Sequence, residues 1–193
     1  MSNPQAITVF TVGHSTRSIG EFISILKAHQ INLVVDVRLT PKSKFNPQFN
    51  KDALSEALKT ESVKYIHLPE LGGFRRPHVN SPNTAWKDKS LRGYADYMET
   101  KEFTENLLKL IALARENRVA IMCAETLPLR CHRTLLSDAL TVRGIQVVHI
   151  LNLEHKFNHE LSPSALVSGV KITYPLYVKE SPQKALTDFG YTT

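Results

Sequence analysis

The densest group of reactive side chains lies in eleven residues, Cys123-Ala-Glu-Thr-Leu-Pro-Leu-Arg-Cys-His-Arg133. They place two thiols, a carboxylate, an imidazole and two guanidinium groups around one loop that contains proline. The apolar run before the loop, Val119–Cys123, indicates a buried strand, and Leu136 and Leu140 after it have helical spacing. The loop therefore joins a strand to a helix. At such a junction the free N–H groups and the dipole of the first helical turn attract anions and favour a thiolate over a thiol.

Three chemistries compete for this loop. A metal site would use Cys123, Cys131 and His132, but the spacing lacks the short Cys-x-x-Cys separations of structural zinc sites and adjacent Cys and His rarely point to one centre. We therefore expect no metal and no other cofactor. A phosphatase-like loop would make Cys123 a nucleophile with Arg130 over the anion. However, six residues intervene instead of the five such loops use, and Pro128 has no N–H to donate.

The remaining interpretation makes Cys123 a packing residue at the end of its strand. Glu125, His132 and Arg133 are then the working polar groups. Cys131 lies at or near the start of the following helix, where its thiol would be acidified.

Polar residues also follow the other expected strands. His14 and Ser15 come directly after Gly13, Asp36 and Arg38 lie two apart on one face, and Gly72-Gly73 permits a tight turn or a close approach to a ligand. Ser15 or Thr16 is most simply the N-cap of the next helix. Ligands of parallel α/β sheets bind beyond the carboxyl ends of the strands, so we expect one pocket there.

Within this pocket the residues divide into two expected roles. Candidate catalytic groups carry acid, base or nucleophile chemistry: His14, Asp36, Glu125, Cys131 and His132. Candidate anion- and substrate-binding groups supply cations, hydroxyls or accessible backbone: Ser15, Arg38, Gly72, Gly73, Arg130 and Arg133.

The elements that must position these residues alternate along the chain. Short apolar runs predict strands over 8–12, 33–37, 65–68, 119–123 and 146–150. Helical apolar faces lie between them, formed by Phe22, Ile25 and Leu26, by Leu54 and Leu58, and by Phe103, Leu107, Leu108, Ile111 and Ala112. This alternation predicts an α/β fold of three layers, a single domain with a mostly parallel sheet and helices on both faces.

The pattern weakens after Leu151, where prolines interrupt short apolar pieces. We expect an α/β domain over residues 1–151, with an irregular extension over 152–193 that packs on the domain or on a partner subunit. The extension gives the chain a possible homodimer contact. His155 and His159, four apart, are most simply a solvated pair, because no carboxylate or cysteine accompanies them at a ligand spacing.

Composition limits the class of protein. The chain has 193 residues, of which 42% are hydrophobic, so one core suffices. Neither a signal peptide nor a membrane-spanning run is evident, and we expect a cytoplasmic protein whose two cysteines stay reduced. A net charge of +6 and a pI near 9.3 favour anionic partners, although a soluble basic surface would give the same balance.

The ordered motifs resemble a known family. They are Gly13-His14-Ser15, then Asp36-Val37-Arg38 with Pro41, Ser43 and Pro47, then Leu71-Gly72-Gly73, Cys123-Ala124-Glu125 and Cys131-His132-Arg133. Over residues 9–150 this set is similar to the bacterial and archaeal family called domain of unknown function 488. The resemblance implies an α/β domain with these motifs gathered in one place, and it implies no reaction.

Two functions from different classes follow. The first is an enzyme that acts on a nucleotide or nucleic acid, with Arg38 and Arg133 on phosphate, Asp36 and Glu125 as carboxylates that orient or transfer protons, and His14 or His132 moving a proton. The second is a non-catalytic module that binds nucleic acid or nucleotide, in which the cysteines only pack. Thiol-dependent sulfur or phosphate transfer and metal binding fit the spacing less well.

Overall fold

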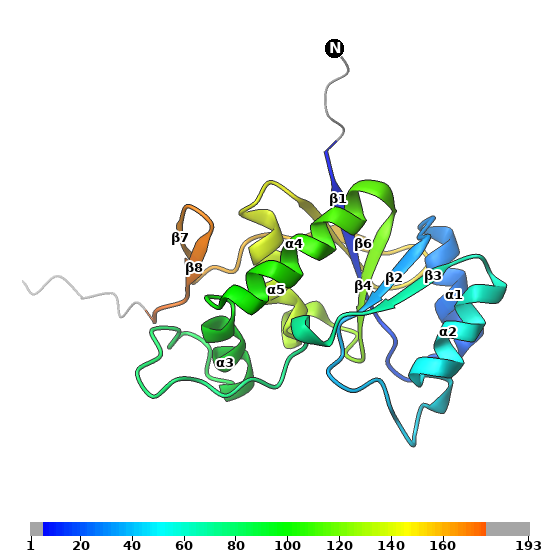
Figure 1. Ribbon diagram of the computed structural model, residues 1–193, viewed down its shortest axis with the longest axis horizontal. Coiled ribbons are helices and arrows are strands. Elements are labelled where there is room, and N and C mark those ends of the chain that lie inside the picture. Colours follow the sequence, from blue (N-terminus) through cyan, green and yellow to red (C-terminus); the bar gives the residue numbers. More distant parts are fainter. Residues whose placement is uncertain (1–5, 177–193) are drawn as a thin grey trace, which may run out of the picture.

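The computed structural model describes residues 6–176 and contains an α/β fold (Figure 1). Five parallel strands and one antiparallel edge strand form a sheet in the order β3-β2-β4-β1-β5-β6. These strands are β1 (Thr8–Gly13), β2 (Leu33–Asp36), β3 (Lys64–His67), β4 (Val119–Cys123), β5 (Gln146–Ile150) and β6 (Lys156–Asn158). The fold class expected from the alternation of apolar runs is confirmed.

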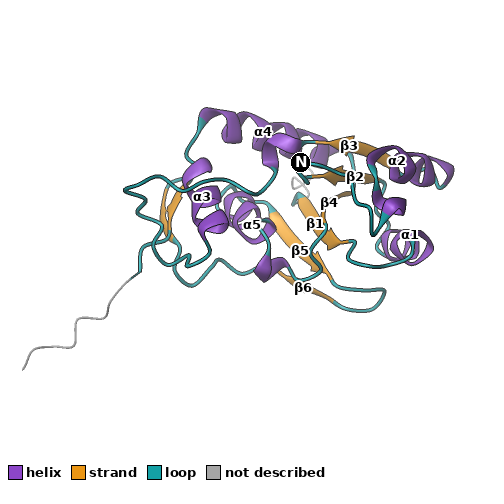
Figure 2. Ribbon diagram, turned by 90° about the horizontal axis from the view of Figure 1, so that it is seen from below, coloured by secondary structure: helices purple, strands orange, loops and turns teal. Residues whose placement is uncertain are grey.

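Helices cover both faces of the sheet, as Figure 2 shows from below. On one face lie α1 (Ile19–Ala28) and α2 (Lys51–Thr60), whose buried side chains pack on Phe10, Val12 and Val34. The other face is covered by α3 (Lys89–Tyr97), α4 (Lys101–Glu116) and α5 (Arg133–Thr141), which share a larger core with Val9 and Val35. Adjacent residues of a strand enter opposite cores because side chains alternate along it.

The sequence identified α4 correctly but misplaced part of its apolar face. Phe103, Leu107 and Ile111 are buried, whereas Leu108 is 54% exposed and Ala112 is also on the solvent side. The helix buries Leu110 and Ala114 instead. Both sets satisfy the helical period, and the tertiary contacts decide which flank of the stripe is covered.

The start of α1 also differs from the expectation. Ser18 is the N-cap, because its hydroxyl accepts from the backbone N–H of Glu21 and the Glu21 carboxylate accepts from the backbone N–H of Ser18. This reciprocal capping box satisfies two free donors of the first turn. Ser15 and Thr16 therefore do not cap the helix, and Ser15 instead has a backbone φ of 48° in the left-handed region.

The segment after residue 151 contains three short strands within its described part. Besides β6, β7 (Leu166–Ser168) and β8 (Lys171–Thr173) form a two-stranded antiparallel sheet. Asp138 of α5 ties the segment to the domain, since its buried carboxylate accepts from Tyr174 Oη at 2.9 Å and Ser162 Oγ at 2.6 Å. The expected homodimer contact stays a prediction, and residues 177–193 lie outside the described part.

His159 is not solvated as expected. Its side chain is 2% exposed and lies between His149, at 2.9 Å, and the Asp138 carboxylate, at 2.8 Å. The four-residue spacing between His155 and His159 gave no sign of this environment, because the partners of His159 come from β5 and α5. Across residues 6–176, helices long and apolar enough to cross a membrane are absent.

The connections on either side of the sheet centre diverge at its carboxyl edge. Strands β1 and β4 are parallel neighbours, with Gly13 beside Cys123. The chain leaves β1 toward α1 on one face and leaves β4 toward α5 on the other. Loops that diverge in this way open a topological switch point, where ligands of α/β proteins bind.

Candidate functional site

Most of the expected site residues lie at this carboxyl edge, but they form two separate clusters. A polar cluster of His14, Asp36, Arg38 and Tyr65 faces α1 and α2. A thiol cluster of Cys123, Cys131, His132 and Arg133 lies toward α5. The ends of β1 and β4 connect the clusters, since the backbone N–H of His14 donates to the carbonyl of Cys123 at 3.0 Å.

The polar cluster is organised around a buried ion pair. Arg38 Nη2 and Nε donate to both oxygens of Asp36, at 2.6 Å for Nη2–Oδ2 and 2.9 Å for Nε–Oδ1. The guanidinium is 8% exposed and the carboxylate is fully buried. Tyr65 Oη donates to the same carboxylate at 2.8 Å, and Arg38 Nη2 also donates to the Phe49 carbonyl at 2.8 Å. Most of the N–H donors of the Arg38 guanidinium therefore have partners inside the protein.

His14 completes this cluster through both ring nitrogens. Nδ1 lies 2.8 Å from the carbonyl of Ser15, and Nε2 lies 3.1 Å from Arg38 Nη1. The ring stacks on Phe49 with 4.2 Å between centroids. Burial, reinforced by the Arg38 charge, lowers the pKa of His14 to about 4. A neutral ring with both nitrogens engaged is suited to positioning Arg38 rather than to moving protons.

We expect stability to fall as this histidine is forced to protonate. The pKa of His14 in the folded state lies below the unfolded value of about 6.5, so its stabilisation is complete above pH 6.5 and is lost toward pH 4. The loss at pH 4.5 is about 2 kcal/mol. Thermal unfolding across pH 4.5–8 should therefore be less acid-sensitive in His14→Gln than in the wild type, with exposed His78→Gln as the control. Equal acid sensitivity in all three proteins would contradict this role.

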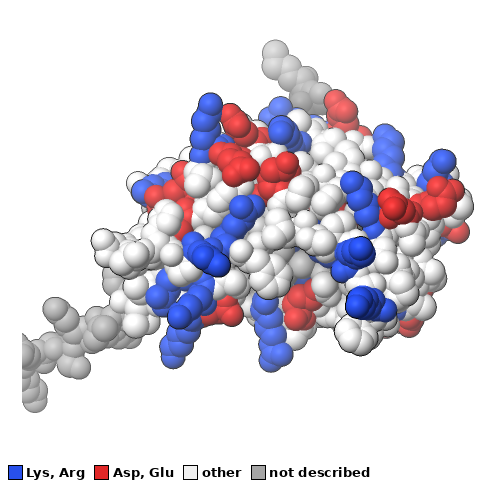
Figure 3. All heavy atoms as spheres, turned by 60° about the horizontal axis from the view of Figure 1, so that its bottom comes forward, with Lys and Arg blue, Asp and Glu red and all other residues white. Residues whose placement is uncertain are grey.

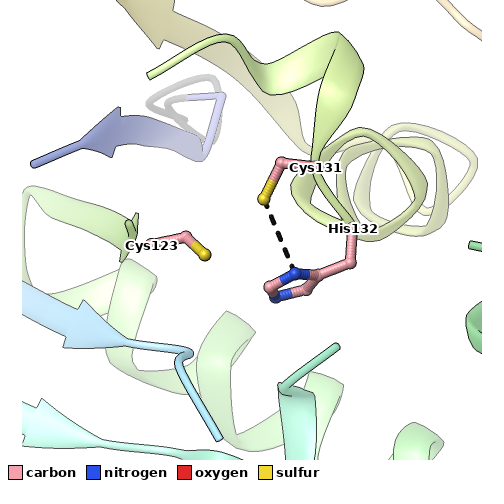
Figure 4. A group of neighbouring side chains, drawn as sticks. All are labelled: Cys123, Cys131 and His132. Atoms are coloured by element: carbon pink, nitrogen blue, oxygen red, sulfur yellow. Dashed lines mark hydrogen bonds between the residues drawn. The ribbon is translucent and has the colours of Figure 1, made fainter. Parts of the chain in front are cut away.

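The thiol cluster brings together side chains from the end of β4 and the start of α5 (Figure 4). The two sulfur atoms and one His132 ring nitrogen all lie within 4.8 Å of one another. Cys131 Sγ is 3.5 Å from His132 Nδ1, and this contact is the dashed line in Figure 4. Cys131 is 5% exposed and His132 is 8% exposed, while Cys123 is half-buried.

Arg133 places a fully buried guanidinium beside these sulfur atoms. Its Nε donates to Cys131 Sγ at 3.4 Å, and its Nη2 donates to the carbonyl of Glu125. Among the described residues, four buried side-chain atoms have no hydrogen-bond partner, and two of them, Arg133 Nη1 and His132 Nε2, lie in this cluster. Unpartnered buried polar atoms are rare because each costs desolvation free energy, and a pair in one cluster marks a place where a further group could bind.

The surrounding groups shift the pKa values of the two thiols in opposite directions. The neighbouring Cys123 thiol lowers the pKa of Cys131, and His132 and Arg133 lower it further. The nearby Cys131 sulfur and burial raise the pKa of Cys123. These opposite directions favour a thiolate on Cys131 over one on Cys123, as expected for a cysteine near a helix start beside an arginine.

The same three side chains could hold a thiophilic cation. The geometric reason for excluding a metal does not hold, because Cys123, Cys131 and His132 do converge despite the adjacency of two of them. The Arg133 guanidinium against Cys131 opposes a cation at this place. The expected absence of metal stays a prediction.

Two glycines hold the loops close to this cluster. A Cβ on Gly13 would lie 2.0 Å from the carbonyl oxygen of Glu125, so β1 and the loop after β4 can approach only through glycine. A Cβ on Gly73 would lie 2.8 Å from Nδ1 of His132. Gly73 thus leaves room for the imidazole, which explains one of the two glycines that the sequence marked.

We expect Gly73→Ala to displace the His132 ring and to lower the free energy of unfolding by about 1–3 kcal/mol, the usual cost of overpacking. Chemical denaturation would measure the loss. Gly20→Ala in α1 is the matched control, because nothing lies within 4 Å of its new Cβ, and it should be neutral or stabilising. The steric account of Gly73 is wrong if both variants have wild-type stability.

The other expected residues lie at the rim. The carboxylate of Glu125 is exposed and its Oε1 accepts from the backbone N–H of Leu127 at 3.0 Å. Arg130 is also exposed, whereas Gly72 is buried against the backbone of Leu39. Sequence reasoning missed Tyr65 and the Phe49 carbonyl, and the sequence has no local signal for either, since both meet the polar cluster only through the tertiary fold.

Comparisons with known proteins give one match. No curated protein and no solved structure matches the chain. Residues 18–140 match the family model described as domain of unknown function DUF488. This range includes every residue of the two clusters except His14, because Gly13-His14-Ser15 lies before its start. The match covers more than half of the chain, and the protein belongs to this DUF488 family.

Proposed function

We propose that this protein is an enzyme that acts on a nucleotide or nucleic acid, with the Cys131 thiolate as its reactive group. The observation that carries the proposal is the contact of Cys131 Sγ with both His132 Nδ1 and Arg133 Nε in a nearly buried site. A thiolate that is only packing has no need of a fully buried guanidinium, which is costly to desolvate.

Each member of the thiol cluster has a distinct capacity. The Cys131 thiolate can attack an electrophilic atom, and the imidazole of His132 can give a proton to the leaving group. The unpartnered Nη1 of Arg133 can donate to an anion or to an oxygen that gains negative charge. The polar cluster supports these groups through the backbone, since Asp36, Arg38 and His14 fix the ends of β1 and β2 and the backbone N–H of His14 donates to the carbonyl of Cys123.

Charge at the same edge supports an anionic substrate. The segments 37–50 and 72–87 follow β2 and β3, and each contains three Lys or Arg residues and no carboxylate. The face that Figure 3 brings forward carries Lys and Arg over its centre and lower part, and the acidic side chains gather mostly toward the upper and right-hand edges. Phosphate contacts therefore come more readily from the exposed cations of these segments, Lys42, Lys44, Arg76 and Lys87, than from Arg38, whose guanidinium is bound to Asp36.

The proposal is tested by incubating the protein with nucleotides and short oligonucleotides and weighing both the substrates and the Cys131 peptide by mass spectrometry. We expect a changed substrate mass or an adduct on Cys131, absent in Cys131→Ser and retained in Glu105→Gln, a variant of an exposed glutamate on α4. Binding without any product or adduct would favour the second candidate, the non-catalytic module, whose affinity comes from the basic edge.

A further inference from the structure

We propose that Phe45 and Phe74 form a platform on which unpaired bases of a single-stranded nucleic acid stack beside the thiol cluster. This inference rests on the proposed function and names the substrate class. Phe45 and Phe74 are 93% and 86% exposed, the most exposed aromatic residues of the described part of the chain. Scattered apolar residues on a surface are ordinary, but these two lie on neighbouring loops at the edge that carries the site.

The backbone holds Phe74 outward at a cost. Its φ is 59°, in the left-handed region that bulky residues rarely adopt. Gly73 on one side packs against His132. Arg75 on the other side lies 3.8 Å from the Tyr97 ring centroid and donates to the carbonyl of Gly72 at 3.2 Å. Strain of this kind persists where surrounding contacts fix it, and it concentrates at functional positions.

The loop that carries Phe45 is also fixed by hydrogen bonds. Ser43 Oγ accepts from the backbone N–H groups of Phe45 at 3.2 Å and Asn46 at 3.0 Å. Asn50 Oδ1 accepts from the backbone N–H of Ser43 at 2.6 Å. The ring is therefore presented by an ordered turn, so that a bound base would not have to pay for ordering the loop.

The two loops contact each other at their bases, where they leave the sheet. They follow β2 and β3, which are paired neighbours in the sheet. A Cβ on Gly72 would lie 3.1 Å from the backbone nitrogen of Leu39, and His67 Nε2 lies 2.8 Å from the carbonyl of Arg38. Phe74 directly follows Gly73, and Gly73 lies against the His132 ring. A base stacked on Phe74 would therefore lie near the thiol cluster.

The positive charge of the two loop segments favours a nucleic acid as the ligand of this platform. Lys42, Lys44, Arg76 and Lys87 are exposed on the two segments, which contain no carboxylate. Aromatic rings for bases combined with cations for the backbone are the usual means of holding a single strand. A duplex offers its phosphates to the cations but no unstacked base to the rings, so we expect a preference for single strands.

The test is fluorescence anisotropy with a labelled 12-nucleotide single strand, as DNA and as RNA, and with the corresponding duplex. Phe45→Ala and Phe74→Ala should each weaken single-strand binding roughly 5- to 100-fold. Phe74→Gly suits the left-handed φ, so it should fold at least as stably and lose the same affinity. Leu108→Ala, at an exposed apolar residue of α4, should bind like the wild type.

Salt dependence separates stacking from charge. Lys44→Gln should reduce the slope of log affinity against log salt by about 0.7, whereas Lys59→Gln on α2 should leave it unchanged. Equal or tighter binding of the duplex, or wild-type affinity in both Phe74 variants, would overturn the platform. The mass-spectrometric assay of Cys131 on the same variants distinguishes this failure from failure of the proposed function, because Cys131-dependent modification of free nucleotides does not require the platform.

Discussion

Asp36→Asn is expected to lower the free energy of unfolding by about 3–5 kcal/mol, because it leaves the Arg38 guanidinium buried without its counter-charge. For a chain of this length the loss corresponds to a fall in Tm of about 6–20 °C. The Asp36 carboxylate accepts from Arg38 Nε and Nη2, from the backbone N–H of Arg38 and from Tyr65 Oη. An amide can satisfy only part of this set, since one of its two polar atoms is itself a donor.

Calorimetry or urea denaturation would measure this loss against two controls. Tyr65→Phe removes one of the donors and should cost about 1 kcal/mol. Glu105→Gln breaks an exposed pair with Lys101 and should change stability by less than about 0.5 kcal/mol. A loss in Asp36→Asn no larger than that in Glu105→Gln would show that the ion pair does not organise the edge of the sheet.

Arg133→Gln should raise the pKa of Cys131 and move the pH midpoint of its alkylation upward. The guanidinium is fully buried with Nε 3.4 Å from Sγ, so its charge acts on the thiolate with little screening by water. Each unit by which the pKa rises corresponds to about 1.4 kcal/mol of lost thiolate stabilisation. Arg133→Lys keeps the charge and should give a smaller change.

The pH midpoint of alkylation separates this electrostatic effect from loosening of the loop. A loosened loop would expose the thiol and speed its reaction at every pH, whereas loss of the charge moves the midpoint upward. Arg143→Gln, in which the cation removed lies just beyond the other end of α5, is the matched control and should leave the midpoint unchanged. An unchanged midpoint in Arg133→Gln as well would remove the electrostatic role of Arg133.

Short apolar runs predicted all five parallel strands. Strands β1, β2, β4 and β5 are mostly buried, which leaves little room for polar residues, whereas β3 lies at the edge of the sheet and is only partly buried. Helix α3 and strands β6, β7 and β8 were missed. All three residues of β6 are on the exposed side, and β7 and β8 are three residues long with Ile172 as their one buried side chain, so their local pattern is weak. Their positions depend on contacts such as Tyr174 with Asp138, more than thirty residues apart in sequence.

The candidate site could be located at an edge from sequence but not divided into its clusters. The two-residue period of a strand predicted that Asp36 and Arg38 point to the same side, and Arg38 Nε does donate to the Asp36 carboxylate. Which face of the sheet each loop crosses is a property of the whole fold, and it separates Asp36 from Cys131. The same limit concealed the convergence of Cys123 with His132. The turn at Pro128–Arg130 reverses the chain and brings Cys131 and His132 back to Cys123.

The central claim, that Cys131 is a thiolate at neutral pH, is tested most directly by the pH profile of iodoacetamide labelling from pH 5 to 10. Trypsin cleaves after Arg130 and so releases the two thiols in separate peptides, which mass spectrometry can quantify independently. Cys123 is the more exposed of the two, so access alone would favour Cys123. We expect Cys131 to react faster, at a rate that is nearly constant above pH 6, and Cys123 to react slowly until strongly alkaline pH. Equal, slow labelling of both, rising about tenfold per pH unit toward the ordinary thiol pKa near 8.5, would contradict the account.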